Sequence, residues 1–585
     1  MSKTEGTTLP PWRNWLLPLA LLVLFLALRL PGLGRFVTTD EALWLRRSAN
    51  FYLAVRHGAW ADTFQSPHPG VLTQWAGAAG FYLVFPQYAQ AGSADIHDSQ
   101  LLRLMENRGV NPLEVLAAGR AILVLLHGAA FLAAWPFARR LLGPRIAALG
   151  LALIAFDPFL IAHQRLLHLD GLLASLMLLA LLAYLDFLRS GSLGALVVSA
   201  LAAGLAWLTK TPAWFLLPAI LALTAYGLWQ HRSSKRSQSP ISNLPIPFTI
   251  FRRFWLAPVA WLALAVLLFF LLFPAMWVAP LEIPQAMAGY ALGSAEGEYG
   301  GPVFFNGVIY PDGELGGAGW LFYPLSFLWR STPLVLAGLG CGLWLAIASF
   351  GQKKKPKQKG ADLLYALAPP LLLAFSLGFT LFMTLAGKKF DRYLLPALLP
   401  LMLVAAWGWV RFSEIIAYRG SLPWLLSRLG RASWSPLALL LVVVWLQLLS
   451  ALPTFPYYLS YYNPLLGGGR GASKVMMVGW GEGLDQAADY LNKKTDLPLG
   501  RVAAWYSVSF NLMFSMQADD IPVVLQLSPS ELAALIDEDY LVIYVHQWQR
   551  GTPQNLLDAL APLEPEYRVW ISGLEYVRVY RLNEN

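Results

Sequence analysis

The first apolar segment of the chain covers residues 15–31 and reads WLLPLALLVLFLALRLP. Its length is close to the roughly 20 apolar residues that an α-helix needs to cross a bilayer. Similar segments recur along the chain, in which 57% of the residues are hydrophobic and only 13% are charged. A soluble protein would carry about twice that charged share. The composition therefore predicts a polytopic α-helical membrane protein.

The spacing of these segments predicts a transmembrane domain over residues 1–452 with about eleven membrane-spanning helices. The pair 194–209 and 212–229 is interrupted by Lys210-Thr211-Pro212, so the turn between the two helices must be very short. The predicted helices cover residues 15–31, 113–138, 145–162, 171–188, 194–209, 212–229, 254–279, 326–349, 362–385, 392–410 and 436–452.

Clusters of lysine and arginine indicate how the helices cross the membrane. Cytoplasmic loops carry an excess of these residues, and every cluster is cytoplasmic if the N-terminus lies inside the cell. The net charge of +9 then follows from topology and requires no nucleic-acid partner. The first span lacks a small-residue cleavage site after it, so we expect a signal anchor. The clusters are Lys3 and Arg13; Arg139, Arg140 and Arg145; Arg232, Lys235, Arg236, Arg252 and Arg253; Lys353, Lys354, Lys355, Lys357 and Lys359; and Arg411, Arg419, Arg428 and Arg431.

Three regions remain for the extracytoplasmic side. The first loop, residues 32–112, contains amphipathic pieces at 41–57 and 99–109 that can lie along the membrane interface. Residues 280–325 are rich in glycine and aromatic residues, which fits either an adaptable loop over a site or a plain connector. In residues 453–585, strands alternate with helices, which predicts a small extracytoplasmic α/β domain.

The C-terminal domain is expected to begin with a strand at residues 475–478. The following Gly479-Trp480-Gly481-Glu482-Gly483 does not meet the GxGxxG spacing of a dinucleotide-binding loop, so it predicts a tight turn from strand to helix. The other expected helices cover 482–494, 529–537 and 553–561, and the other strands cover 501–505, 540–545, 567–572 and 575–581.

Two adjacent carboxylates, Asp40 and Glu41, follow the first span. Like charges repel and lose hydration beside a bilayer, so the pair requires a cation, a metal or a functional task. Thr39 and Asp40 are also good capping residues, which leaves a solvated helix N-terminus as a second interpretation. Because Cys341 is the only cysteine, any divalent metal would have to use histidine and carboxylate ligands, which Asp40, Glu41 and His68 could supply, although no diagnostic metal spacing occurs.

Other charged residues beside the spans fall on the same outer face in this topology. Any one of these charged side chains could simply extend to the lipid headgroups. Basic residues in extracytoplasmic loops are nevertheless unusual, because lysine and arginine are enriched in cytoplasmic loops. Together they favour a functional site at the membrane surface. They are Arg120 in the second span; His163, Arg165, His168 and Asp170 between the third and fourth; Lys210 between the fifth and sixth; and Lys388, Lys389, Asp391 and Arg392 between the ninth and tenth.

A lipid-linked sugar phosphate fits these residues. Its phosphate would accept charge-assisted hydrogen bonds from Lys210, Lys388, Lys389 and Arg392, while its hydrocarbon tail stays in the bilayer. A carboxylate such as Asp40 could take the proton from an attacking hydroxyl. One base without a protein nucleophile predicts a single displacement with inversion at the sugar carbon.

At these residues the chain resembles the GT-C glycosyltransferases of family 39, which include the protein O-mannosyltransferases and the lipid A aminoarabinose transferases. The resemblance implies a multi-pass enzyme of the cell membrane that moves a sugar from a polyprenyl-phosphate donor to a protein or lipid hydroxyl on the extracytoplasmic face. The similar motifs are Thr39-Asp40-Glu41, His68-Pro69, Arg120, Arg165 with Leu169-Asp170, Leu208-Thr209-Lys210-Thr211-Pro212 and Lys389-Phe390-Asp391-Arg392-Tyr393-Leu394-Leu395-Pro396.

The resemblance also implies roles for the acidic residues. It places the catalytic base on Asp40 and makes Glu41 its partner, which would hold Arg120 or the acceptor. Asp170 is expected to pair with Arg165 or to cap the fourth span.

The resemblance further implies that the basic residues that lie near the donor phosphate in this family correspond to Lys210, Lys389 and Arg392. His68 is expected to orient the first loop, to contact the acceptor or only to pack.

The chain departs from the eukaryotic members, because residues 280–325 are too few for their β-trefoil insertion. The run from Tyr457 to Pro464, ahead of the C-terminal domain, instead resembles stretches of bacterial and archaeal relatives. Two other functions stay open. A transporter or flippase would place charges near the membrane midplane in repeated halves, and a lipid-phosphate-sugar hydrolase would use water as the acceptor.

Overall fold

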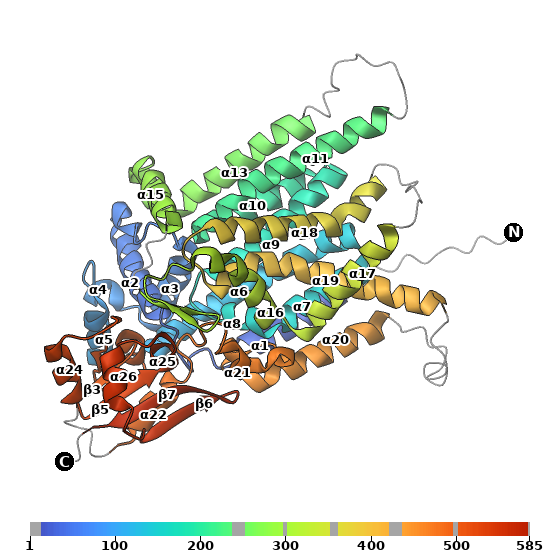
Figure 1. Ribbon diagram of the computed structural model, residues 1–585. Coiled ribbons are helices and arrows are strands. Elements are labelled where there is room, and N and C mark those ends of the chain that lie inside the picture. Colours follow the sequence, from blue (N-terminus) through green and yellow to red (C-terminus); the bar gives the residue numbers. More distant parts are fainter. Residues whose placement is uncertain are drawn as a thin grey trace.

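The computed structural model describes residues 13–236, 252–296, 301–350, 361–419, 436–494 and 501–582. Within these ranges the predicted fold class is confirmed: a body of membrane-spanning helices carries a C-terminal domain built on a β-sheet (Figure 1). Lys3, the Lys353–Lys359 cluster, Arg428 and Arg431 lie outside the described residues.

Each of the eleven predicted spans corresponds to a helix in the described part of the chain. Seven helices there are long and apolar enough to cross a membrane, and α16 with α17 forms a pair bent by 113°, which is either one broken span or a re-entrant loop. Four shorter apolar helices are also present, and three of them, α1, α7 and α10, coincide with the remaining predicted spans. The helices are α1 (Arg13–Arg29), α6 (Pro112–Leu142), α7 (Pro144–Phe156), α9 (Asp170–Ser190), α10 (Leu193–Thr209), α11 (Leu216–Arg236), α13 (Ala257–Leu272), α16 (Gly319–Arg330), α17 (Pro333–Phe350), α18 (Ala361–Leu385), α19 (Leu395–Arg419) and α20 (Pro436–Ala451).

Proline residues interrupt three of the predicted spans. Pro158 ends the third after α7, and the short α8 (Pro158–His163) follows, with the Asp157 side chain accepting from Leu160 N at its N-terminus. Pro274 separates α13 from α14 (Ala275–Val278), and Pro333 separates α16 from α17. Proline lacks the N–H that a helix interior needs, and it disfavours helical backbone in the residue before it.

Helix α9 forms the centre of the helical body. All of its apolar window is buried inside the protein, and it contacts α6, α10 and α19. Apolar residues surround it on every side, so it is fixed by packing against protein rather than by lipid. Asp170, at its first turn, is thereby placed at one end of the helical body.

Two inserted regions lie at the same end of the body as Asp170. Residues 32–112 form η1 (Trp60–Thr63) and the helices α2 (Glu41–His57), α3 (Val71–Val84), α4 (Tyr88–Ala91) and α5 (Asp98–Asn107), so both predicted amphipathic pieces are helical. Residues 282–318 contain α15 (Glu282–Glu296), the hairpin β1 (Val303–Phe305) and β2 (Val308–Tyr310), and the 3-10 turn η4 (Gly316–Ala318).

The C-terminal domain contains a five-stranded sheet in the order β4-β3-β5-β7-β6. Strands β3, β4 and β5 run parallel, and β7 runs antiparallel to β5 and β6. The strands are β3 (Val502–Ala504), β4 (Asp519–Asp520), β5 (Tyr540–Tyr544), β6 (Tyr567–Ile571) and β7 (Leu574–Arg581). The helices are α21 (Gly468–Ala472), α22 (Leu484–Asn492), α23 (Ser507–Phe510), α24 (Pro529–Ile536), α25 (Val545–Arg550) and α26 (Gln554–Leu560).

The predicted strand at residues 475–478 is wrong. Met476 forms only an isolated bridge with Phe305, and Val478 N donates to the side-chain oxygen Oε1 of Gln549 at 3.0 Å. This backbone bonds to a side chain instead of a neighbouring strand, although Met476 and Val478 are buried as a strand would require.

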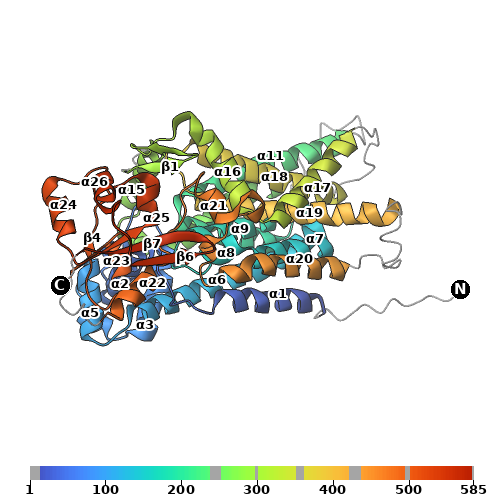
Figure 2. The same ribbon diagram turned by 60° about the horizontal axis from the view of Figure 1, so that its bottom comes forward.

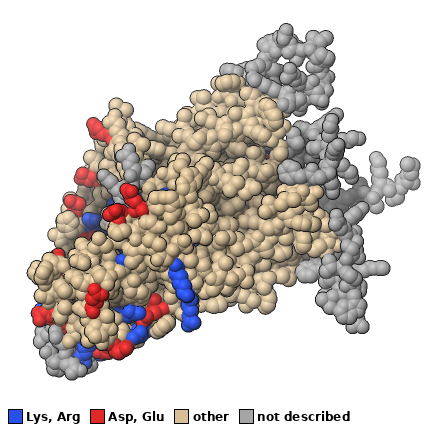
Figure 3. Space-filling view, viewed as in Figure 1, with Lys and Arg blue, Asp and Glu red and all other residues tan. Residues whose placement is uncertain are grey.

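The sheet lies at the same end of the helical body as α2–α5, and the N-terminal end of α1 lies at the opposite end (Figures 1 and 2). We call the end formed by residues 41–107 and 501–582 the polar end. On the face seen in Figure 3, acidic and basic side chains gather over the polar end and are sparse on the helical body. This distribution is the one expected for a body surrounded by lipid.

Candidate active site

The Asp40 carboxylate lies where the first loop, α9 and the segment before α19 meet. Its Oδ2 atom is 3.3 Å from Nε2 of His168 and 3.3 Å from Nη2 of Arg392. The side chain is 37% exposed, and it turns to these two partners rather than to the first N–H groups of α2. Asp40 occupies the N-cap position of α2, as the second interpretation expected, but its side chain makes no capping hydrogen bond, and its carboxylate is both held by other partners and accessible.

The surroundings of Asp40 keep it ionised. Burial by itself would raise the pKa of this carboxyl, but the hydrogen bond from His168 and the charges of Arg392 and Lys210 outweigh it and hold the pKa well below its usual range. A carboxylate that stays ionised can accept a proton from a hydroxyl placed beside it.

Asp170 forms the second carboxylate of the cluster. Its Oδ1 atom accepts from the Lys210 ammonium at 2.6 Å, and its Oδ2 atom lies 3.3 Å from Nε of Arg392 and 3.5 Å from Nδ1 of His168. His168 and Arg392 thus bridge Asp40 and Asp170. Two carboxylates and three basic side chains form one connected network.

The predicted pairing of Asp170 with Arg165 is wrong, and so is its predicted role as a side-chain cap of α9. Arg165 instead donates to the carbonyl oxygens of Leu28 at 3.1 Å and Pro31 at 2.6 Å. Leu169 occupies the N-cap position, so Asp170 begins the helix and its carboxylate turns to Lys210.

Lys210 is extended between α10 and the 3-10 turn η2 (Thr211–Phe215). Its ammonium lies 4.0 Å from the centre of the Tyr393 ring. Burial lowers the pKa of Lys210 below its ordinary value, and the charge of Asp170 opposes this effect. The Lys210 side chain is 11% exposed, and its ammonium binds Asp170, the carboxylate that Arg392 also contacts.

The two lysines before Arg392 diverge. The Lys388 ammonium lies 5.5 Å from the centre of the Phe390 ring, which itself packs on the Arg392 guanidinium. Burial, together with the charges of Arg392 and Lys210, lowers the pKa of Lys388. The Lys389 ammonium donates to the carbonyl oxygen of Ala386.

Glu41 is fully buried and forms an ion pair with Arg120, as the sequence suggested. Its two oxygens accept from Arg120 Nε at 2.6 Å, from Leu167 N at 2.7 Å, and from both N and Oγ1 of Thr38 at 2.9 Å. Arg120 also donates to the carbonyl oxygens of Leu33 and Phe36. These bonds tie α2 to α6 and to the loop before α9, directly behind Asp40.

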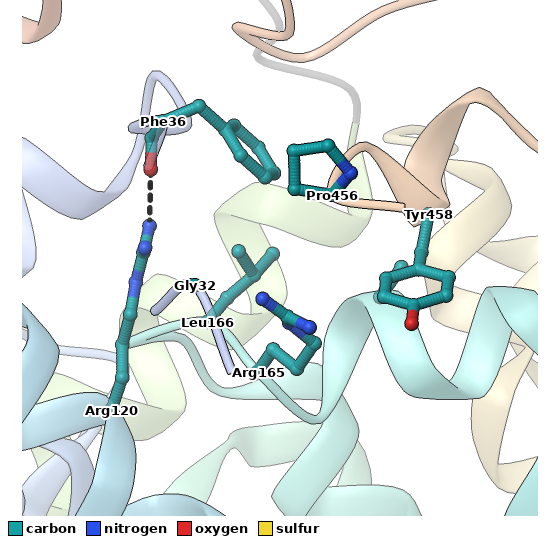
Figure 4. A pocket seen from close by; sticks show the side chains of 8 residues that line it. Gly32, Phe36, Arg120, Arg165, Leu166, Pro456 and Tyr458 are labelled. Carbon is teal, nitrogen blue, oxygen red and sulfur yellow. Dashed lines mark hydrogen bonds between the residues drawn. The ribbon is translucent and has the colours of Figure 1, made fainter. Parts of the chain in front are cut away.

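Figure 4 shows Arg120 donating to the Phe36 carbonyl at the wall of a small cavity. Arg165 and Tyr458 approach the cavity from the other side. All Arg120 and Arg165 bonds named above run to carbonyls or to Glu41, so we assign both arginines to the support of residues 28–41 rather than to substrate.

Two further histidines face the cluster. Burial and the charges of Lys210 and Arg47 lower the pKa of His68 to about 3, so it is neutral; its ring lies 5.7 Å from that of Trp44 and 5.5 Å from that of Tyr290. Among the described residues, neither ring nitrogen of the buried His163 has a hydrogen-bond partner.

Two residues that the sequence did not single out complete the network. Trp480, from the turn at residues 479–483, places its ring 4.2 Å from the Arg392 guanidinium. Arg330 binds Asp391 at 2.7 Å and holds the residue next to Arg392. In the sequence, Trp480 could have been noticed because it lies between two glycines. Arg330 could have been noticed because it ends an apolar helix.

Within the described ranges, no group of three His, Cys, Asp or Glu side chains is placed to hold a metal ion. The histidines and carboxylates of the cluster have arginine and lysine between them, which disfavours a cation at the same place.

A search of curated protein sequences finds no match. Among solved structures, the chain is similar to ArnT from Cupriavidus metallidurans bound to undecaprenyl phosphate, with 15% identity, a TM-score of 0.46 and coverage of 97% of this chain and 98% of ArnT. It is also similar to the Archaeoglobus fulgidus oligosaccharyltransferase, with 11% identity, a TM-score of 0.43 and coverage of 96% and 72%. Similarity to the S. cerevisiae Pmt1-Pmt2 complex bound to the sugar donor has 16% identity, a TM-score of 0.34 and coverage of 51% and 39%.

The family of dolichyl-phosphate-mannose-protein mannosyltransferases matches residues 114–277. The matched part contains His168, Asp170 and Lys210, while Asp40 and Arg392 reach the same cluster from outside it. The resemblance to GT-C glycosyltransferases predicted from the motifs is therefore confirmed by a match to the dolichyl-phosphate-mannose-protein mannosyltransferase family.

Proposed function

We propose that the protein transfers a sugar from a polyprenyl-phosphate donor to a hydroxyl of a protein or lipid acceptor. The observation that carries this proposal is the position of Asp40, an accessible carboxylate within 3.3 Å of Arg392 and joined through it to Asp170 and Lys210. A base and a set of phosphate-binding cations lie side by side at the polar end of a membrane body. The matching family is named for a lipid-phosphate sugar donor of this kind.

The cations have a chemical role in this reaction. When the bond between sugar and phosphate breaks, negative charge develops on the lipid phosphate, and Arg392, Lys210 and Lys388 can stabilise it with donors already in place. The acceptor hydroxyl gives its proton to Asp40 while its oxygen bonds to the sugar carbon. The sugar inverts, and the polyprenyl phosphate leaves with the electron pair of the broken bond.

The side of the membrane on which the polar end lies is inferred from the distribution of lysine and arginine along the chain, not from the geometry of the site. The arginines and lysines of the sequence clusters fit a cytoplasmic position, and Asp40 lies on the first loop after a single span. We therefore propose that the polar end, together with a C-terminal domain of residues 453–585, faces the extracytoplasmic side. The donor would enter from the outer leaflet.

Purified protein in lipid nanodiscs tests this proposal with a set of polyprenyl-phosphate sugars. We expect release of polyprenyl phosphate to depend on an added acceptor, and mass spectrometry to find the sugar on the acceptor. Release at the same rate without acceptor would identify a hydrolase. Movement of intact donor across the bilayer, without release, would identify a flippase.

Replacement of Arg392 by alanine is expected to weaken donor binding about 10- to 150-fold, because a hydrogen bond to a charged group is worth about 1.5–3 kcal/mol. The measurement is the affinity for a polyprenyl phosphate in nanodiscs. Arg103→Ala, an exposed arginine on α5, is the matched control and should bind as the wild type does. Unchanged affinity in Arg392→Ala would place the phosphate elsewhere.

Replacement of His168 by leucine, which cannot donate a hydrogen bond, is expected to move the acid limb of kcat/KM to higher pH. The hydrogen bond from His168 depresses the pKa of Asp40, so its loss lets that pKa rise toward about 3.9. The interaction between His168 and Asp40 stabilises the folded protein at pH values above the pKa that Asp40 has in the unfolded chain. This stabilisation is lost as the pH falls through the lower pKa of Asp40 in the folded protein. An acid limb at the same pH in both proteins would show that His168 does not tune the base.

A further inference from the structure

The turn at residues 479–483 belongs to the C-terminal domain but touches the candidate active site at two places. The first is Arg392, whose guanidinium carbon lies 4.2 Å from the centre of the Trp480 ring and 4.0 Å from the centre of the Phe390 ring. Both rings pack against the guanidinium, while its Nη2 atom lies 3.3 Å from Asp40 and its Nε atom lies 3.3 Å from Asp170.

The second place is the backbone segment that precedes Asp40. Thr39 N donates to the carbonyl oxygen of Trp480 at 3.3 Å, and the Ser509 hydroxyl donates to the carbonyl oxygen of Thr38 at 3.2 Å. Gly481, with φ of +117°, packs so closely that a Cβ atom there would lie 2.4 Å from the carbonyl oxygen of Val37. Only glycine fits this approach.

The turn itself is anchored in the core of the C-terminal domain. The buried Glu482 accepts from Trp480 N and from the Tyr544 hydroxyl at 3.2 Å, and Gly481 N donates to the oxygen of that hydroxyl at 2.8 Å. Tyr544 ends β5 in the middle of the sheet. The position of Trp480 is thus set by the sheet and not by the membrane helices.

His168 connects the two places. Its ring meets the Trp480 ring edge-on at 4.9 Å between centres, while its Nε2 atom lies 3.3 Å from Asp40. One indole therefore contacts both groups that hold Asp40. Removing it would leave Arg392 and His168 free to tilt, although neither would lose its own charge.

We infer that Trp480 is a positioning residue through which the C-terminal domain aligns Arg392 and His168 with Asp40. This inference rests on the proposed glycosyl transfer. Trp480 itself touches neither the proton nor the phosphate in this assignment. The C-terminal domain is then part of the active site and not only an attached module.

Trp480→Ala tests this inference. A misaligned base and cation lower the chemical step, so we expect kcat to fall about 10- to 100-fold in well-folded protein. Trp480→Phe keeps a ring against Arg392 and should stay within about fivefold of the wild type. Trp570→Ala, which removes a tryptophan that is 56% exposed on β6, is the matched control and should be fully active.

A double-mutant cycle distinguishes positioning from general damage to the domain. Trp480→Ala should weaken binding of a polyprenyl phosphate about tenfold alone and by less than about twofold in the Arg392→Ala background, because both changes remove one interaction. Equal losses in both backgrounds, or a Trp480→Phe variant as impaired as Trp480→Ala, would overturn the inference. Because the cycle is read by binding, it still decides the coupling if the wild type transfers no sugar, an outcome that would contradict only the proposed function.

Discussion

Asp40→Asn is expected to lower sugar transfer by about 10²–10⁴-fold, the usual contribution of a general base. Asparagine keeps the shape of the side chain and can still bond to His168 and Arg392, but its amide cannot take a proton from the acceptor hydroxyl. Donor binding should change little, because Arg392 retains Asp170 at 3.3 Å. The measurement is the initial rate of transfer at saturating donor and acceptor.

The control for this variant is Asp62→Asn, an exposed carboxylate in η1 of the same loop. It should be as active as the wild type, and both variants should show the thermal unfolding midpoint of the wild type. Transfer by Asp40→Asn within about tenfold of the wild type would remove the base assigned here. Loss of transfer in both variants would point to damage of the whole first loop.

The membrane fold could be read from the sequence because its signal is repeated and local. Each span needs its own run of apolar residues, and each of the eleven predicted runs coincides with a helix in the described part of the chain. Seven or eight of these helices have the length and composition of a membrane span. Interruptions by Pro158, Pro274 and Pro333 were missed, since an apolar stretch stays apolar across a proline.

The members of the candidate site could also be predicted, but not all of their partners. Counting spans puts Asp40, Lys210 and Arg392 on one face, and the structure brings all three into one network. Asp170 was paired with Arg165 because they are neighbours in sequence. Its real partner, Lys210, depends on how α9 is rotated against α10, and apolar residues on every side of α9 hide that rotation from the sequence.

The contribution of the C-terminal domain was beyond sequence reasoning for a different reason. Trp480 reaches Arg392 only because a sheet folded from residues 502–581 holds the turn over the membrane helices. The sequence showed a glycine-rich turn, and the tight-turn prediction is consistent with positive φ at Gly479, Gly481 and Gly483. Trp480 contacts Arg392, which lies in the segment before α19 and far from Trp480 in the sequence. A single sequence does not reveal such a contact.

Glu41→Ala is expected to destabilise the protein by about 3–5 kcal/mol, the usual cost of breaking a buried ion pair from one side. The change leaves the Arg120 guanidinium, only 2% exposed, without its carboxylate inside the protein. It also removes the acceptor of the Leu167 and Thr38 N–H groups. The loss is measured from the unfolding midpoint in detergent, with the exposed Glu106→Ala on α5 as the unaffected control.

A second variant separates the buried charge from the lost contacts. In Glu41→Leu combined with Arg120→Met, both charges are gone and the volume is largely kept, so the double variant should be more stable than Glu41→Ala. Its transfer rate should nevertheless stay low, because residues 33–41 lose the bonds that hold Asp40 towards His168. A double variant with full activity would show that Glu41 and Arg120 stabilise the loop without positioning the base. A stable Glu41→Ala would show that the pair carries less of the fold than its burial implies.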